Sequence, residues 1–368
     1  MYKSVAFGKF RDYFFHMRCE TVTIEGLVDD ALRRGIGSAA SAILAVDGVP
    51  QLEHHAGTVR RWDAPGIAST GEHAAVGAST RFDLASVTKP IVAAALLAEL
   101  DARGLDAALP AAELLPEFRE PALRTVPLAR LLSHTAGFAP EWPDRAPDPG
   151  AARFRAGARP VAPAGSTHRY SCIGFIWAGL AAEALAAAPL DAVVQRRVLD
   201  PLGMRETGFR PAPELRERIA ATEWQPGRGL VHGEVHDETA AAIGGVSGNA
   251  GLFGTSADLL RFAEALRTGG TADAGQGLAP AVVEAMTRPA ALPDDPGFGQ
   301  ALGPRLDEGW MRRLGPSTAG HTGFTGTAFA TEPGGRRSLV LLVNRVHPSR
   351  DSDAIHTLRA RVAEAAGR

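Results

Sequence analysis

A hydroxyl and an amine, those of Ser86 and Lys89, lie three positions apart in the sequence. The apolar run from Pro90 to Leu100 predicts a buried helix that starts at this point. Side chains three residues apart share one face of a helix, so the hydroxyl and the amine would point into the same space. A serine hydroxyl is a weak nucleophile until a neighbouring base activates it, and this pairing could supply that base.

The S-x-x-K spacing alone is weak evidence, because it also fits an N-cap serine followed by a surface lysine. Two segments further along the chain strengthen the catalytic interpretation. Tyr170 lies in Arg169–Phe175, which opens another apolar helix. The sequence His-Thr-Gly at positions 321–323 precedes a hairpin pattern, in which two strand-like runs flank the turn Glu332–Gly335.

Taken in this order, the three segments resemble the motifs of the serine β-lactamase-like family, which includes class C β-lactamases, penicillin-binding-protein-like D,D-peptidases and esterases. Tyr170 follows Ser86 by 84 positions (170 − 86) and His321 follows it by 235 (321 − 86), similar to the class C and esterase branch. The resemblance covers roughly residues 22 to 366 and includes Leu131–Phe138, Asp200–Met204 and Gly244–Phe253. It implies a serine hydrolase that forms an acyl-enzyme and uses no cofactor or metal.

The resemblance implies a role for each motif residue. Ser86 would attack a carbonyl carbon, and either Lys89 or Tyr170 would accept its proton. Unperturbed pKa values of about 10 leave both groups protonated at neutral pH. Burial lowers the pKa of a lysine, and a nearby cation lowers the pKa of a tyrosine, so the two titrations are coupled. From the likeness to class C enzymes we expect Tyr170 to be the base, with Lys89 supporting its charge.

The groups around the substrate follow from the same resemblance. The backbone N–H groups of Ser86 and Phe324 would form the oxyanion hole. His321, Thr322 and Gly323 would lie along the substrate, where a glycine lets a bound acyl chain approach the strand closely.

Three residues depart from the family pattern. Cys172 replaces the asparagine or aspartate at the third place of Y-x-N, and we interpret it as a small buried thiol rather than a catalytic one. His321 replaces the lysine of K-T-G; it is mostly neutral at pH 7 and would hold a substrate carboxylate less strongly. The H-T-G form occurs in the peptidase and esterase branches, so it argues against a true β-lactamase. Asn249 stands where related sequences often carry histidine.

Other constellations compete with these motifs. Ser247-Gly248-Asn249 also matches S-x-N and could replace the tyrosine segment, although its glycine-rich surroundings favour a structural loop. The run His232–Glu238 is rich in possible metal ligands but lacks the H-E-x-x-H spacing, so we interpret it as a polar loop near the cleft. The sequence contains no G-x-S-x-G elbow, which argues against an α/β-hydrolase.

The composition is typical of a globular enzyme. The 368 residues are 45% hydrophobic with a formal net charge of −2, and no basic stripe or membrane-length apolar run indicates nucleic acid or a membrane as a partner. The two cysteines, Cys19 and Cys172, argue against a disulfide scaffold. No signal-peptide pattern is recognisable, so we expect a cytoplasmic location. The family resemblance implies a small ester, amide or peptide as the substrate.

Strand patterns at both ends of the chain, with helical patterns between them, predict a discontinuous α/β (α+β) domain and an inserted helical domain. The resemblance makes this a β-lactamase/transpeptidase-like fold, in which helices flank an antiparallel sheet. We assign residues 21–85 and 295–368 to the sheet domain and 86–294 to the helical domain, with the active site in the cleft between them. Residues 1–20 look unlike the rest and form an N-terminal arm, a candidate for disorder.

The sequence thus favours a serine hydrolase with an acyl-enzyme at Ser86. A carboxylesterase-like hydrolase of small esters is the first interpretation, because of the expected location and His321. One alternative is an amidase or D-amino-acid peptidase that acts on cell-wall fragments, with weak β-lactam hydrolysis. Another is a non-catalytic penicillin-binding sensor, which Cys172 makes conceivable.

Overall fold

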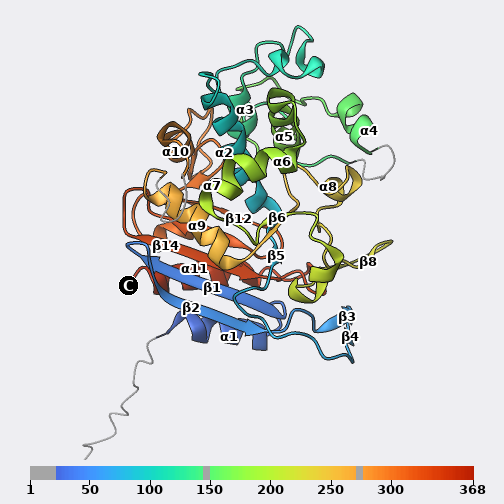
Figure 1. The fold of residues 1–368 in the computed structure, drawn as a ribbon, viewed down its shortest axis with the longest axis vertical. Helices are drawn as coiled ribbons and strands as arrows, with labels where there is room; N and C mark the ends of the chain where they lie inside the picture. Colours follow the sequence, from blue (N-terminus) through green and yellow to red (C-terminus); the bar gives the residue numbers. More distant parts are fainter. Residues whose placement is uncertain (1–21, 144–149, 271–276) are drawn as a thin grey trace, which may run out of the picture.

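Segments from both ends of the chain build one antiparallel sheet (Figure 1). The computed structural model describes residues 22–143, 150–270 and 277–368, and in that part the sheet has seven strands. Their spatial order is β10 (Gly299–Gln300), β11 (Arg305–Leu306), β12 (Ala319–Thr322), β13 (Ala328–Thr331), β14 (Arg337–Val343), β1 (Ala39–Val46) and β2 (Val49–Gly57). Because β14 pairs with β1, the C-terminal hairpin lies beside the N-terminal one.

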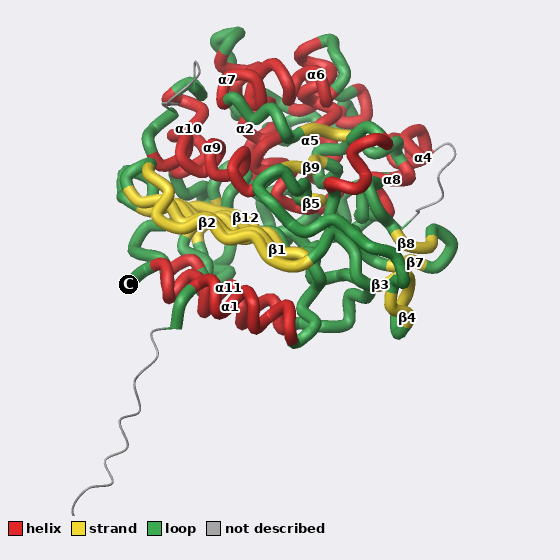
Figure 2. The backbone as a smooth tube through the Cα atoms, turned by 60° about the horizontal axis from the view of Figure 1, so that its bottom comes forward, coloured by secondary structure: helices red, strands yellow, loops and turns green. Residues whose placement is uncertain are grey.

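Helices cover both faces of this sheet (Figure 2). On one face pack α1 (Ile24–Arg33) and α11 (Ala354–Ala366), and on the other packs α9 (Ser256–Arg267). The buried apolar residues of α1 recur at helical spacing, so one stripe of the helix faces the core. Thr23 caps this helix, because its side chain accepts the Gly26 N–H at 3.2 Å.

The helical part lies on the α9 side of the sheet. Its central helices, α2 (Thr88–Asp101) and α5 (Cys172–Ala186), are apolar on nearly every side and pack against each other. Around them lie α3 (Leu128–Leu132), α4 (Gly150–Gly157), α6 (Leu190–Val194), α7 (Asp200–Leu202), α8 (Glu238–Ala242) and α10 (Pro280–Thr287). One continuous hydrophobic core joins α2 and α5 to the sheet residues Phe329, Val340 and Leu342, so the helical part is fixed against β13 and β14.

Short strands are also present outside the main sheet. One small sheet has β9 (Leu252–Gly254) between β5 (Phe82–Asp83) and β6 (Gly208–Phe209). Two further pairs are β3 (Trp62–Ala64) with β4 (Ile67–Ala68), and β7 (Trp224–Gln225) with β8 (Gly229–Leu230). Strands of two or three residues leave no periodic pattern, which is why the sequence does not reveal them.

The predicted architecture, an antiparallel sheet flanked by helices, is confirmed. The sequence patterns at residues 39–46 and 52–59 predict the first two strands; β1 has the expected bounds, but β2 starts at Val49 instead of Leu52 and ends at Gly57. The difference arises at the turn, where Asp47 and Gly48 both have positive φ (52° and 81°) and reverse the chain in two residues. The N-terminal arm, with Cys19, lies outside the described residues.

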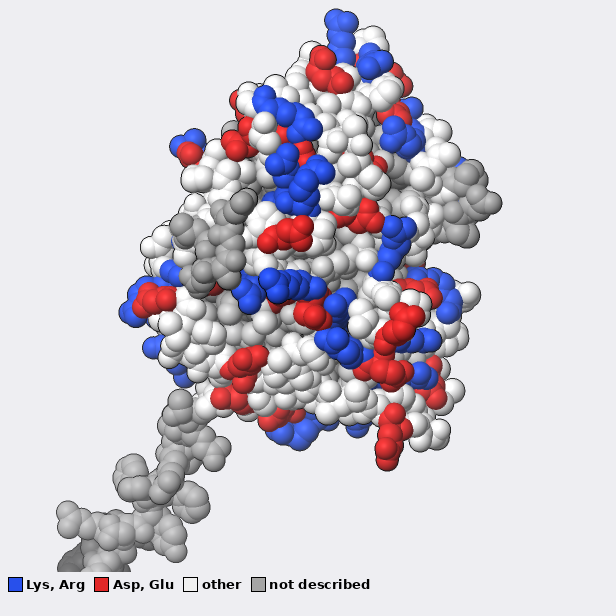
Figure 3. Space-filling model, viewed as in Figure 1, with Lys and Arg blue, Asp and Glu red and all other residues white. Residues whose placement is uncertain are grey.

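Acidic and basic side chains are intermixed over the face shown in Figure 3, in keeping with the net charge of −2. Within the described ranges, no single helix has the length and apolar character needed to cross a membrane. In the same described part of the chain, α5 and the segment Leu190–Leu202 pass that test together, as a pair bent by 79°.

One buried carboxylate anchors the end of α2, the helix that carries Lys89. Glu99 is fully buried and accepts hydrogen bonds from Arg196 (2.5 Å), Arg197 (2.8 and 3.2 Å) and Arg103. Burial alone would raise the pKa of Glu99, but these arginines lower it to about 2. The ion pairs fix α2 against the segment that follows α6.

We expect Glu99→Gln to lower the free energy of unfolding by about 2–3 kcal/mol. Removing one partner of a buried ion pair costs about 3–5 kcal/mol, but here the arginine side chains are 30–50% exposed. Since folding lowers the pKa of Glu99, its contribution is complete above the ordinary value of 4.5 and is lost as the pH falls toward about 2. Urea unfolding at pH 7 and pH 3 measures this, and an equal loss at both pH values would contradict it.

Candidate active site

Ser86 lies on a 3₁₀ turn, Ala85–Val87, that leads directly into α2. Ala85 has a left-handed backbone (φ 46°), which costs a non-glycine residue on the order of 1–3 kcal/mol. Asp83 holds this conformation, because its carboxylate accepts the N–H groups of Ala85 (2.8 Å) and His236 (2.7 Å). The helix therefore begins two residues after the serine, and the strained turn exposes Ser86 to the adjoining cavity.

The Lys89 side chain is fully buried, and its ammonium has an acceptor for each of its three N–H groups. Nζ lies 2.9 Å from Ser86 Oγ, 3.0 Å from the Asn249 carbonyl oxygen and 3.5 Å from Cys172 Sγ. Ser86 Oγ therefore accepts a hydrogen bond from Lys89, and its own proton is available to another group.

Lys89 keeps its proton at neutral pH. Burial alone would lower its pKa, but electrostatic interactions with the Cys172 sulfur and the Tyr170 phenol raise the pKa of Lys89 to about 12. Burial raises the pKa of the Cys172 thiol as well. A lysine in this state donates hydrogen bonds and positive charge to its neighbours.

Tyr170 lies beside this pair, on the loop that leads into α5. Its ring centroid is 5.0 Å from Lys89 Nζ and 5.0 Å from the guanidinium carbon of Arg305, so two cations lie near the ring. Tyr170 and Ser86 line the same cavity. The structure thus gathers the predicted hydroxyl, amine and phenol in one place.

The turn after β12 is bonded directly to the strand that precedes the serine turn. Thr325 Oγ1 donates to the Asp83 carbonyl (2.7 Å), and Thr327 Oγ1 donates to the Leu84 carbonyl (2.9 Å). Gly323 packs tightly at this junction, since a Cβ there would lie 2.6 Å from the Leu84 carbonyl oxygen. These contacts fix the two segments relative to each other.

The predicted oxyanion donors come from these two segments. Ser86 and Phe324 both line the cavity. Neither backbone N–H donates a hydrogen bond to another atom of the described chain. Both N–H groups are therefore available to a substrate oxygen, as an oxyanion hole requires.

His321 is fully buried, and its Nδ1 donates to the Thr322 carbonyl at 2.9 Å. Burial lowers the pKa of His321 well below its ordinary value, and the positive charges of Arg305 and Lys89 lower it further. The ring is neutral and offers no positive charge to a substrate carboxylate. The sequence predicts a weakened contact between His321 and a substrate carboxylate. A neutral ring cannot supply that charge, so a substrate with a carboxylate would need another cation in the site.

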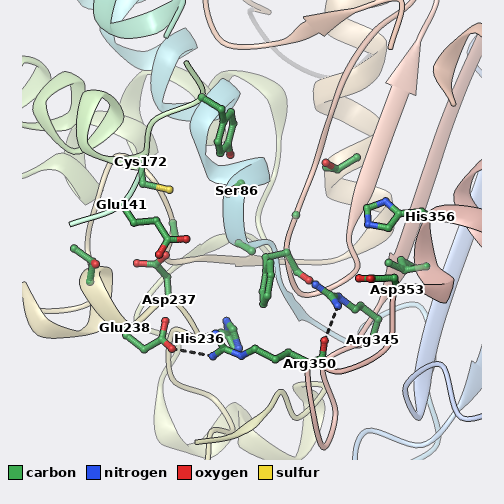
Figure 4. A pocket seen from close by; sticks show the side chains of 18 of the residues that line it. Ser86, Glu141, Cys172, His236, Asp237, Glu238, Arg345, Arg350, Asp353 and His356 are labelled. Carbon is green, nitrogen blue, oxygen red and sulfur yellow. Dashed lines mark hydrogen bonds and ion pairs between the residues drawn. The ribbon is translucent and has the colours of Figure 1, made fainter. Parts of the chain in front are cut away.

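A cavity of about 340 Å³ opens beside Ser86. Figure 4 shows Cys172, Glu141 and Asp237 on one side of this serine and Arg345 on the other. The charged and imidazole groups of the lining are Glu141, Asp237, Glu238 and Asp353, Arg305, Arg345, Arg350 and Arg359, and His236 and His356. A lining with charges of both signs suits a polar substrate.

The polar loop expected near the cleft supplies part of this lining. His236, Asp237 and Glu238 reach the cavity, and His236 Nε2 lies 2.8 Å from the Glu223 carboxylate. In the residues that the structure describes, no group of three or more His, Cys, Asp or Glu side chains could hold a metal ion.

Sequence reasoning missed many residues of the cavity lining and, close to the catalytic groups, Arg305, Asn249 and His134. Arg305, on β11, belongs to no motif and gave no signal. Asn249 was interpreted as part of a structural loop, but its carbonyl accepts a Lys89 N–H. His134 lies in the family-like stretch Leu131–Phe138, which was the only signal for it; its ring accepts the Ser171 N–H at 3.1 Å.

A model of the beta-lactamase family matches residues 24–364. The chain belongs to the beta-lactamase family. This confirms the resemblance drawn from the three motifs. The findings identify a serine hydrolase of the beta-lactamase-related type, as predicted.

Solved structures show the same fold. The structure titled "EstCE1, a hydrolase with promiscuous acyltransferase activity" is 22% identical with a TM-score of 0.71, and the match covers 93% of this chain and 97% of that one. A class C beta-lactamase is 19% identical, also with a TM-score of 0.71, over 92% of this chain and 94% of that one.

A curated relative is more similar in sequence but over a shorter stretch. The protein of Salmonella schwarzengrund named "Putative D-alanyl-D-alanine carboxypeptidase" is 33% identical over 202 residues. The match covers 50% of this chain and 46% of the relative, so the chain spans less than half the length of that protein.

We expect Gly323→Ala to lower kcat by about 100-fold, because a catalytic group displaced by about 1 Å loses about that much rate. The added Cβ would lie 2.1 Å from Thr327 Oγ1 as well as against the Leu84 carbonyl, so the turn and the Phe324 N–H must move away from the serine. Steady-state hydrolysis of p-nitrophenyl acetate measures the loss. The matched control is Gly309→Ala, where a Cβ meets open space; a wild-type kcat in Gly323→Ala would refute the packing argument.

Proposed function

We propose that this protein is a carboxylesterase-like hydrolase that transfers the acyl group of a small ester to Ser86 and then to water. The observation that carries the proposal is the 2.9 Å hydrogen bond from the Lys89 ammonium to Ser86 Oγ, at the edge of a cavity. It sets a nucleophile beside a fixed positive charge, with the Phe324 N–H available across the cavity.

Acylation begins when Ser86 Oγ attacks the ester carbonyl carbon. Lys89 already carries its full set of protons, so Tyr170, in its phenolate form, accepts the serine proton and passes it to the departing alcohol. The positive charges of Lys89 and Arg305 lie 5.0 Å from the centre of the Tyr170 ring. The N–H groups of Ser86 and Phe324 donate to the oxyanion, and each such donor is worth about 2.7–4 kcal/mol in the transition state.

Deacylation repeats these steps with water as the nucleophile. Tyr170 accepts a proton from water as its oxygen attacks the acyl carbon, and the proton returns to Ser86 Oγ when the acid leaves. The same two N–H groups hold the second oxyanion. One set of groups therefore serves both halves of the reaction.

We expect Ser86→Ala to lower p-nitrophenyl acetate turnover by about 10⁴-fold or more, since the acyl acceptor is gone. Cys172→Ser is the matched variant: it keeps a hydrogen-bond acceptor for Lys89 and should retain turnover within about tenfold. Stopped-flow measurement of p-nitrophenol release follows both. Turnover that survives in Ser86→Ala but not in Cys172→Ser would assign the nucleophile to the thiol, and stable acylation without turnover would favour a penicillin-binding sensor.

The arginine-rich lining favours a second candidate, hydrolysis of peptides or amides that carry a carboxylate. Arg345 and Arg359 are held by carbonyls of the turn after β12, at 2.7 Å (Phe324) and 2.8 Å (Gly323). Arg305 lines the same cavity; its Nη1 is paired with the Glu308 carboxylate at 2.5 Å, and its buried Nε has no hydrogen-bond partner within the described residues. A guanidinium presents planar paired donors that match a carboxylate. The name of the Salmonella relative agrees with such a substrate.

If the second candidate holds, Arg305→Met lowers kcat/KM on an N-acylated D-alanyl-D-alanine by about 10–100-fold, because the carboxylate loses its cation. The kcat/KM on p-nitrophenyl acetate, which has no carboxylate, should stay within about threefold. Arg312→Met, which removes an exposed arginine, is the control. Equal losses on both substrates would show that Arg305 acts on Tyr170 rather than on the substrate, and absence of dipeptide cleavage by the wild type would leave the esterase proposal.

A further inference from the structure

His134 is bonded to the chain on both sides of Tyr170. Its carbonyl oxygen accepts the Arg169 N–H (2.9 Å), and its ring Nδ1 accepts the Ser171 N–H (3.1 Å). The residue is 3% exposed and has a left-handed backbone (φ 58°). One buried residue thus supplies the acceptors for the two N–H groups that flank the tyrosine.

The imidazole also packs against the phenol. The ring centroids of His134 and Tyr170 lie 4.6 Å apart, and the His134 and Phe175 centroids lie 5.0 Å apart. Phe175 belongs to α5, so the His134 ring contacts both the tyrosine and the helix that follows it. Tyr170 is held through its ring as well as through its backbone.

The bond from Ser171 determines which nitrogen of His134 carries the proton. Nδ1 accepts from a backbone N–H and must be bare, so the single ring proton is on Nε2. Burial lowers the pKa of His134 well below its ordinary value, and the positive charges of Lys89 and Arg305 lower it further. The ring therefore remains neutral, and Nδ1 remains an acceptor, at pH 7.

We propose that His134 is a positioning residue for Tyr170, whose ring and bare Nδ1 hold the phenol in place for proton transfer with Ser86. The inference rests on the proposed role of Tyr170 as the base. The described residues that line the cavity do not include His134, so it acts through the tyrosine and not on the substrate. A loop of this kind needs such support, because a displacement of about 1 Å at a catalytic group costs about 100-fold in rate.

Two variants test the acceptor without straining the backbone, since glycine and asparagine both tolerate positive φ. His134→Gly removes the ring and Nδ1; we expect kcat on p-nitrophenyl acetate to fall by about 30–100-fold with KM within about twofold. His134→Asn restores an acceptor oxygen near the position of Nδ1 and should recover at least tenfold of that loss. Equal kcat values in the two variants, or a wild-type kcat in His134→Gly, would overturn the proposal.

A double-mutant cycle with Tyr170→Phe separates a positioning role from general destabilisation. If His134 acts through the phenol, His134→Gly costs less than about threefold in the Tyr170→Phe background. An undiminished loss there would overturn the proposal. If Tyr170→Phe itself keeps the wild-type kcat, Tyr170 is not the general base and the proposed mechanism is wrong. That result differs from one in which Tyr170 is essential but His134→Gly has no effect on kcat.

Ser166→Ala provides the matched control in the same loop. It removes an exposed hydrogen bond of 2.7 Å, from Ser166 Oγ to the Pro163 carbonyl, and Ser166 is not among the described residues that line the cavity. We expect kcat to be unchanged. A loss in Ser166→Ala as large as that in His134→Gly would mean that the loop tolerates no change, and would overturn the specific assignment to His134.

Discussion

A buried ammonium with an acceptor for every N–H is the interaction on which the rest of the site depends. An unpaired charge in the interior costs several kcal/mol, so Lys89 is tolerated only because Ser86, Asn249 and Cys172 surround its nitrogen. Each acceptor comes from a different segment: the turn before α2, the glycine-rich stretch and the start of α5. Satisfying one charge therefore brings three distant parts of the chain together beside the nucleophile.

The turn after β12 must also lie at a fixed distance from Ser86 and Lys89. Two threonine hydroxyls of the turn after β12 bond to consecutive carbonyls before the serine, at residues 83 and 84. The strained backbone at Ala85 is kept in place by Asp83, whose carboxylate accepts two N–H groups. Strain beside the proposed nucleophile, Ser86, is thus offset by hydrogen bonds that also fix the segments of the two proposed oxyanion donors. Because these hydrogen bonds hold the two segments close together, there is no room for a Cβ at position 323, and a glycine is needed there.

Periodicity was sufficient to predict the sheet at the two ends of the chain and the buried helix after Ser86, and the family resemblance implied the gathering of Ser86, Lys89 and Tyr170. They could not reveal Arg305 or His134, because these residues act through contacts with segments far away in the sequence. The charge state of His321 was also out of reach, since it depends on burial and on Arg305 nearby. Local patterns specify elements, whereas the electrostatics of a cavity depend on which elements meet.

The central claim is that Ser86 carries the acyl group during turnover. The most direct measurement is acid quenching of the protein during p-nitrophenyl acetate hydrolysis, followed by peptide mass spectrometry. The account predicts an acetyl group on the peptide that contains Ser86, localised to that hydroxyl by fragmentation and present in the steady state. Acetyl transfer to Cys172 or another side chain, or turnover with no covalent adduct under the same quench, would contradict it.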